Sequence, residues 1–220
     1  MKLVDINIKK AKAPFDFKKH HKELYSPQAK PGIVEVPGMV FITIDGQGNP
    51  NTSQVYAEAI ETLYGLSYSI KMAKGDSKPE GFFEHVIPPL EGLWWGIDVR
   101  NGGIDKDKLR WTSMIRQPDF VTQEVFERAK DALGKKKPGL DISKASLLTI
   151  KEGLCAQILH IGSYDDEPAT VQALEAYIGE SGYRTDFSDA RKHHEIYLSD
   201  PRKVAPEKLK TIIRLPIAKV

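Results

Sequence analysis

Hydrophobic and polar residues alternate along the chain with the periods of strands and helices. Met39 to Ile44 is a bulky, β-branched run that ends at the turn residues Asp45 and Gly46, which indicates a strand. Beyond it, apolar side chains recur at three- and four-residue steps from Tyr56 onward, which indicates a helix. The first half of the chain predicts a strand, a helix and two further strands at 39–44, 51–75, 93–99 and 109–115, with a turn at 101–103 between the last two.

The second half of the chain repeats this order of patterns. The apolar run 154–161 ends at Gly162, as the earlier run ends at Gly46, and Pro168 opens a helical pattern that stops by Gly182. Two more apolar runs close this half, at 193–198 and 210–217. Each half therefore predicts a β-α-β-β unit, and the whole chain predicts an α+β fold built by structural duplication.

The segments that flank these units complete the domain organisation. The N-terminal segment is basic and contains four prolines, which predicts an irregular leader. It either packs on the domain through apolar side chains such as Phe15 and Leu24, or forms a disordered tail. Thr122 and Gly134 bracket a further helix in the middle of the chain. We expect a leader, then one domain over 39–220 made of a first half, a connector helix region and a second half: 1–38, 39–117, 118–149 and 150–220.

Composition and charge exclude several classes of protein. The 220 residues include 32 Lys and Arg against 30 Asp and Glu, so the net charge of +2 argues against a protein built mainly to bind nucleic acid. A hydrophobic fraction of 40% argues against intrinsic disorder. No apolar run is long enough to span a membrane, and the N-terminus lacks the apolar core of a signal peptide. Since Cys155 is the single cysteine, no internal disulfide can form, and we expect a cytoplasmic protein.

The candidate motifs for binding a cofactor or a metal are incomplete. The turn 46–51 starts like a dinucleotide-binding fingerprint, but Asn51 stands at the third glycine position and Pro50 removes an amide that could face a phosphate. The histidines lack metal-ligand spacing, and the neighbours His193 and His194 point to opposite faces of a strand, so they cannot share one ion. We expect neither a metal nor a cofactor.

One acid and several aromatic residues remain as candidates for chemistry. Glu195 lies in the middle of a predicted strand, where it is either an exposed acid on the wet face of the sheet or the acid of an aromatic pocket. Trp94 and Trp95 point to opposite faces of their strand, so at least one lies on a face that helices do not cover. Tyr64 and Tyr68, one helical turn apart, add an aromatic ledge. Aromatic residues on an uncovered surface favour the pocket.

Five separate motifs, in order along nearly the whole chain, resemble the GyrI-like small-molecule-binding family: 25–27, 36–39, 45–51, 56–68 and 194–198. The resemblance implies a continuous antiparallel sheet from both halves, with helices on one face and a ligand groove on the other. In drug-sensing members, which carry a DNA-binding module, a glutamate in an aromatic pocket holds lipophilic cations, and Glu195 and Tyr197 fall on that motif. Residues 1–38 are too short and too rich in proline for a helix-turn-helix, so we do not expect a transcription factor.

The resemblance also implies candidate functions for the groove. It implies binding of planar, lipophilic, cationic small molecules and, by similarity to the family's cyclopropanoid hydrolases, opening of a strained ring by water. Glu195 would then be the base that activates water, and Tyr68 a hydrogen-bond donor. An alternative is a protein contact that inhibits DNA gyrase, without catalysis; neither nucleic acid nor membrane is expected as a partner, and the oligomeric state is open. The ligand-binding residues implied are Tyr64, Trp94, Trp95, Trp111, Tyr164, His193 and Tyr197.

Overall fold

The computed structural model describes residues 13–95 and 105–220. Its helices, including four short 3-10 turns, are α1 (Phe17–His20), α2 (Lys22–Tyr25), α3 (Gln54–Lys71), η2 (Gly75–Ser77), η4 (Lys106–Lys108), α4 (Gln123–Lys136), η5 (Tyr164–Asp166), α5 (Glu167–Glu180) and η6 (Pro206–Lys208). Its strands are β1 (Gly32–Gln47), β2 (Leu90–Trp95), β3 (Arg110–Arg116), β4 (Ser146–Ile161), β5 (Tyr183–Thr185), β6 (His193–Tyr197) and β7 (Lys210–Lys219). The predicted turn 101–103 and residues 96–99 of the predicted strand lie outside the described residues.

All strand pairs are antiparallel, and the sheet closes on itself. Its order is β4-β1-β3-β2-β6-β7, and β4 also pairs with β7, which completes the ring, while β5 adds to β7. Closure depends on the length of β1 and β4, because each pairs with one neighbour along its first part and with another along its last part. The α+β class and the antiparallel sheet are as predicted, but the sheet is closed instead of open, and β5 was not predicted.

Two strands begin earlier than the sequence pattern indicates. β1 starts at Gly32, inside the segment predicted as an irregular leader, because Pro37 does not interrupt the pairing. The register passes from Val36 opposite Gly153 to Gly38 opposite Lys151, and the exposed proline, which lacks an amide hydrogen, takes no position in the ladder. β4 likewise starts at Ser146, inside the predicted connector.

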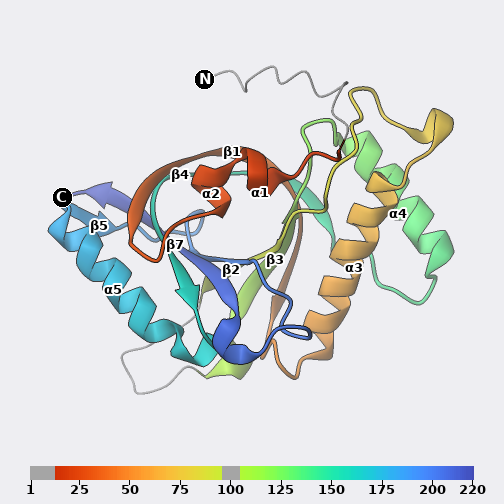
Figure 1. Ribbon diagram of the computed structural model, residues 1–220. Helices are drawn as coiled ribbons and strands as arrows, with labels where there is room; N and C mark the ends of the chain where they lie inside the picture. The colour runs from red at the N-terminus through yellow and green to blue at the C-terminus, as the bar shows by residue number, and fades with distance from the viewer. Residues whose placement is uncertain (1–12, 96–104) are drawn as a thin grey trace.

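The inner surface of the closed sheet is filled by side chains. The apolar ones come from six strands: Val36, Met39, Phe41, Leu93, Met114, Cys155, Ile196 and Ile212. At one end, α1 and α2 lie within the curve of β1 (Figure 1). There the N-terminal segment buries Phe15, Phe17, Leu24 and Tyr25 in the same cluster. The described part of the leader is therefore packed on the domain.

The helices cover separate parts of the outer surface. α3 and α4 pack over β1 and β3, with Ile42, Leu63 and Trp111 in their core, and α5 packs over β4 and β7 (Figure 1). Gly46 makes the first of these cores possible, since a Cβ atom there would lie 2.2 Å from the Trp111 ring. Among the described helices, none combines the length and apolarity needed to cross a membrane.

The outer faces of β2 and β6 lie between the two helical layers, on the same surface as the helices. The expectation of a groove on the face opposite the helices is therefore wrong. That opposite face is the interior of the closed sheet, which buried side chains of the described strands occupy.

Candidate functional site

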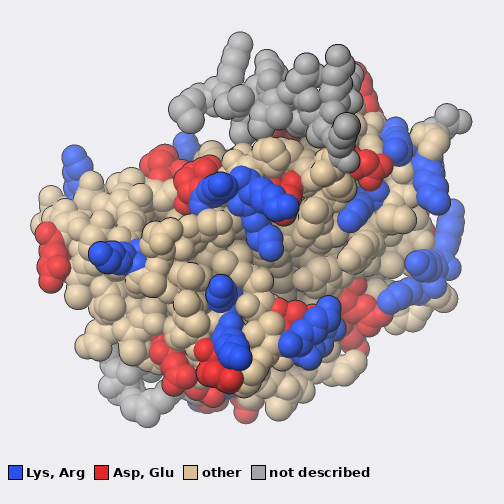
Figure 2. Space-filling model, viewed as in Figure 1, with Lys and Arg blue, Asp and Glu red and all other residues tan. Residues whose placement is uncertain are grey.

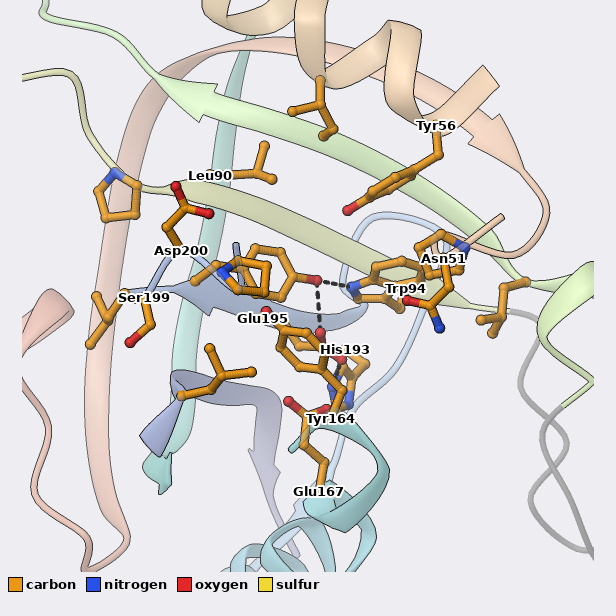
Figure 3. Close-up of a pocket in the computed structure, with 18 of the residues that line it drawn as sticks. Asn51, Tyr56, Leu90, Trp94, Tyr164, Glu167, His193, Glu195, Ser199 and Asp200 are labelled. Atoms are coloured by element: carbon orange, nitrogen blue, oxygen red, sulfur yellow. Dashed lines mark hydrogen bonds and ion pairs between the residues drawn. The ribbon is translucent and has the colours of Figure 1, made fainter. Parts of the chain in front are cut away.

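A cavity of about 1830 Å³ opens on the outer surface between α3 and α5. Residues of β2 and β6 form its floor, and residues of both helices and of the segment 198–202 form its walls (Figure 3). Pockets for drug-sized ligands usually measure about 300–1,000 Å³, so this cavity has room for a large molecule.

Strand alternation decides which side chains of β6 reach the cavity. His193, Glu195 and Tyr197 face it, whereas the intervening His194 and Ile196 face the interior. Glu195 is thus a pocket residue, with a side chain only 14% exposed, and not an acid on a wet sheet face.

The floor of the cavity is organised around Trp94 of β2. Trp94 lies opposite His193, and its Nε1 donates a hydrogen bond of 2.9 Å to the Tyr197 hydroxyl. Gly92, opposite Glu195, provides the space for this contact. A Cβ atom at Gly92 would lie 2.8 Å from the indole nitrogen and 3.1 Å from the Tyr197 oxygen.

Hydrogen bonds hold the Glu195 carboxylate in one orientation (Figure 3). The Tyr197 hydroxyl donates to Oε2 over 2.7 Å, and Nε2 of His193 lies 3.1 Å from Oε1, where it donates when it carries the ring proton. Donors of this kind stabilise the ionised carboxylate. Because Trp94 donates to Tyr197 in turn, three side chains form one chain of hydrogen bonds that ends on Glu195.

A second carboxyl group meets Glu195 from α5. Glu167 is only 8% exposed and lines the same cavity as Glu195, and its Oε1 lacks a hydrogen-bond partner among the described residues. Burial, and next the charge of Glu195, raise the pKa of Glu167 far above its usual range. A buried carboxyl group beside a second acid is stabilised in its protonated form, so Glu167 holds a proton next to Glu195. We call Glu167 and Glu195 the acid pair.

Aromatic rings surround the acid pair. Tyr164 meets Tyr197 edge to face with ring centres 5.9 Å apart, and Tyr56 lies 6.2 Å from the Trp94 ring. Burial, followed by the nearby acids, raises the pKa of Tyr164 to about 12. The phenols are thus neutral at physiological pH and present π faces and hydroxyl donors to whatever occupies the cavity.

The other residues expected at the site are spread more widely. Tyr64 and Tyr68 line the cavity at its rim, where Tyr68 is 51% exposed, and Trp95 lines it with the Lys192 ammonium 4.3 Å above its ring. Among the hydrogen bonds of the described residues, the donor to Glu195 is Tyr197 and not Tyr68. Trp111 does not line the cavity, because its ring is fully buried beneath α3.

Two residues of the site did not follow from the sequence. Tyr56 was recognised as part of the helical stripe, but its four-residue spacing through Ile60 to Tyr64 places it on the cavity side of α3. Glu167 had no signal, since an acid in the first turn of a helix is an ordinary complement to the helix dipole.

The same strands bury a second group of charges on the interior side, which we call the interior cluster. His194 lies 3.0 Å from Glu91 and 2.9 Å from Glu152, and Arg214 lies 2.9 Å from Glu152. The Tyr25 hydroxyl donates to Glu91 over 3.0 Å, which ties the N-terminal segment to the cluster.

Mutual attraction outweighs desolvation in the interior cluster. Burial opposes the charge on His194, but Glu152 and Glu91 together raise its pKa to about 9. Burial likewise opposes the charge on Glu152, but His194 and Arg214 lower its pKa to about 2. His194 is therefore protonated at neutral pH, with Nδ1 donating a hydrogen bond to Glu152 and Nε2 forming an ion pair with Glu91. Within the described residues, no cluster of three or more His, Cys, Asp or Glu side chains could hold a metal ion.

Solved structures from Listeria innocua are similar to the whole chain. One is described as a hydrolase, with 45% identity over 93% of this chain and 100% of that chain and a TM-score of 0.86. Another, an uncharacterized conserved protein, has 46% identity with the same coverage and TM-score. The C-terminal domain of EcmrR, 13% identical over 87% of this chain and 98% of that chain with a TM-score of 0.51, shares the fold alone.

Among curated proteins, none matches this chain. The sequence profile of the GyrI-like small molecule binding domain, by contrast, matches residues 29–218, which include the cavity and the acid pair. The chain therefore belongs to the GyrI-like small molecule binding domain family.

Proposed function

We propose that the cavity between α3 and α5 binds planar, lipophilic cations. The observation that carries this proposal is the Glu195 carboxyl group, 14% exposed in a cavity lined by the rings of Tyr56, Trp94, Tyr164 and Tyr197. A buried carboxylate without a cation is costly, and a delocalised organic cation can neutralise it at a smaller desolvation cost than an ammonium ion. Aromatic faces add cation–π attraction of about 0.5–2 kcal/mol.

Attraction to cations must come from this local charge and not from the protein as a whole. The net charge is +2, and the face shown in Figure 2 mixes acidic and basic side chains. The electrostatic field of the whole protein would therefore repel cations weakly.

Tryptophan fluorescence tests the proposal directly, because Trp94 forms the floor of the cavity. A planar cationic dye such as a rhodamine is expected to quench the emission, and Glu195→Gln is expected to weaken binding at least tenfold, about 1.4 kcal/mol or more, by removing the charge. Glu180→Gln, an exposed acid at the far end of α5, is the matched control and should bind as the native protein does. Absence of quenching, or equal loss in the two variants, would contradict the proposal.

A second function, hydrolysis of cyclopropanoid compounds in the same cavity, is favoured by the unequal protonation of the acid pair. One acid is ionised and can act as a base, and the other is neutral and can act as an acid. We infer that Glu195 takes a proton from water while the water oxygen bonds to a ring carbon. The ring C–C bond then breaks, and the released electron pair takes a proton from Glu167. The similarity to a protein described as a hydrolase also supports this function.

Mass spectrometry separates catalysis from binding. Incubation with a cyclopropane-bearing alkylator is expected to yield the product of water addition, and both Glu195→Gln and Glu167→Gln are expected to slow turnover by 10²-fold or more, the usual contribution of general acid–base groups being about 10²–10⁴. Glu180→Gln again serves as the control. Recovery of unchanged compound would leave the protein as a binder, and full turnover in Glu195→Gln would exclude the mechanism.

A further inference from the structure

The acid pair contains two carboxyl groups and one proton. Glu167 and Glu195 come from different elements, α5 and β6, and line the same cavity, where Glu167 is buried without a lysine or arginine partner among the described residues, which favours its protonated form. Together they therefore carry one negative charge, and a second negative charge forms if Glu167 loses its proton. The buried Glu167 Oε1, which has no donor among the described residues, is an acceptor that could take a second positive group.

Lysine and arginine side chains line the cavity, but within the described residues none of them forms an ion pair with the acid pair. Lys106 bonds to Asp165 over 2.7 Å and Arg202 to Asp200 over 2.9 Å, while Lys192 stacks on Trp95. The titratable groups that face the acid pair are Tyr56 from α3, Tyr164 from η5, and His193 and Tyr197 from β6, with Asp165 and Asp200 farther out in the walls.

We propose that the cavity distinguishes organic cations by their charge. A monovalent cation pairs with the ionised carboxyl and leaves the Glu167 proton in place, whereas a divalent cation displaces this proton into solvent. The inference rests on the proposed function, since it concerns the same site and the same class of ligand.

Charge balance gives the reason. A monocation with the singly charged acid pair makes a neutral complex, so no proton needs to move. A dication would leave one positive charge buried without a partner, which is costly, and ionising Glu167 restores balance. The step is a simple exchange, in which the O–H proton of Glu167 passes to the buffer and the dication takes its place.

Ethidium and propidium are suitable probes, because they share one planar cationic ring system and propidium carries an additional ammonium group. Titration calorimetry near neutral pH, in phosphate and in Tris, reports the protons released from the dependence of the binding enthalpy on the buffer. We expect no proton release for ethidium and release of one proton for propidium. The affinity for propidium should rise by up to tenfold per pH unit above neutral, while that for ethidium stays level.

Glu167→Gln identifies the source of the proton. The amide keeps a donor toward Glu195 but cannot ionise, so proton release with propidium should fall from one to zero and its pH dependence should vanish. Glu180→Gln should keep both. Ethidium releasing a proton, propidium releasing none, or propidium still releasing one from Glu167→Gln would each overturn the inference while cation binding itself stands. If neither dye binds, the proposed function fails first.

Discussion

The two faces of β6 carry two buried groups of acids that differ in one respect. In the interior cluster, Glu91 and Glu152 form ion pairs with His194, and Glu152 also with Arg214, so each acid has a cationic partner. In the acid pair, Glu167 and Glu195 line one cavity, the pKa of Glu167 is raised by burial and by Glu195, and neither acid has a lysine or arginine partner among the described residues.

This contrast separates a structural role from a functional one. Buried charges that satisfy each other hold the fold together, and removing one partner is costly because it leaves the other charge alone. Acids that lie close together in a cavity repel each other, and binding of a cation or a proton relieves this repulsion. Such groups are therefore common at functional sites. Adjacent residues, His194 and Glu195, serve these two roles because a strand turns them to opposite sides.

The largest effect is expected from breaking the interior cluster. Arg214→Met leaves Glu152, Gln157 and the Leu24 carbonyl without their shared donor and should lower the free energy of unfolding by about 3–5 kcal/mol. Urea denaturation measures it. Arg202→Met, which removes an exposed arginine from its pair with Asp200, is the control and should change little. Equal losses in the two variants would contradict the structural role of the cluster.

The interior cluster should lose its contribution to the free energy of unfolding at both high and low pH. The raised pKa of His194 means that its contribution is complete below about pH 6.5 and disappears as the pH rises through about 9, a loss of up to about 3 kcal/mol. The lowered pKa of Glu152 means that its contribution is present above about pH 4.3 and disappears as the pH falls toward about 2. Urea denaturation midpoints measured from about pH 2 to about pH 9 test both effects. A midpoint that does not change with pH would refute them.

Substitution in the acid pair should raise the free energy of unfolding, whereas substitution in the interior cluster should lower it. Since the raised pKa of Glu167 favours the protonated form in the folded state, its contribution to stability is present below about pH 4.3 and declines as the pH rises. Glu167→Gln removes this penalty and should stabilise the protein by about 1–2 kcal/mol at pH 8, with no gain at pH 4. Glu175→Gln, an exposed acid on the same helix, should do neither. A loss of stability at pH 8 would count against a strained acid pair.

The smallest effect is expected from crowding the floor of the cavity. Gly92→Ala places a methyl group against the Trp94 nitrogen and the Tyr197 hydroxyl, which should cost about 1 kcal/mol and shift the Trp94 emission. Gly179→Ala, a helical position with open space around it, should be neutral or slightly stabilising. Unchanged emission and stability in Gly92→Ala would mean that the floor tolerates rearrangement.

Local patterns predicted most helices and strands, because bulky runs and helical spacing are local properties. Local patterns did not predict the features that depend on pairing between strands far apart in the sequence. Nothing near Ser146 or Gly32 indicates that β4 and β1 extend to meet each other and close the sheet. The same limit applies to the groove, which was placed on the wrong face because closure turns the other face into the interior.

The site was predictable to the extent that it lies on regular elements. Glu195 and Tyr197 followed from the family resemblance, strand alternation left open which of Trp94 and Trp95 faces the groove, and the structure places all four at the cavity. Glu167 could not follow, since its importance arises from contact with a residue on another element. Trp111 was mistaken for a ligand contact because sequence cannot tell an aromatic residue under a helix from one in a groove.

Closure of the sheet also limits how two copies of this protein can associate. Six of the described strands have a hydrogen-bonded neighbour on each side, and β5, only three residues long, is the one at the end of the order. Sheets join across molecules, in assembly or in aggregation, through unpaired backbone groups at such ends. In β1 over 32–40 and in β4 over 146–154 the backbone likewise pairs on one side only, so strand addition is confined to these stretches and β5, and self-association elsewhere would have to depend on side-chain surfaces.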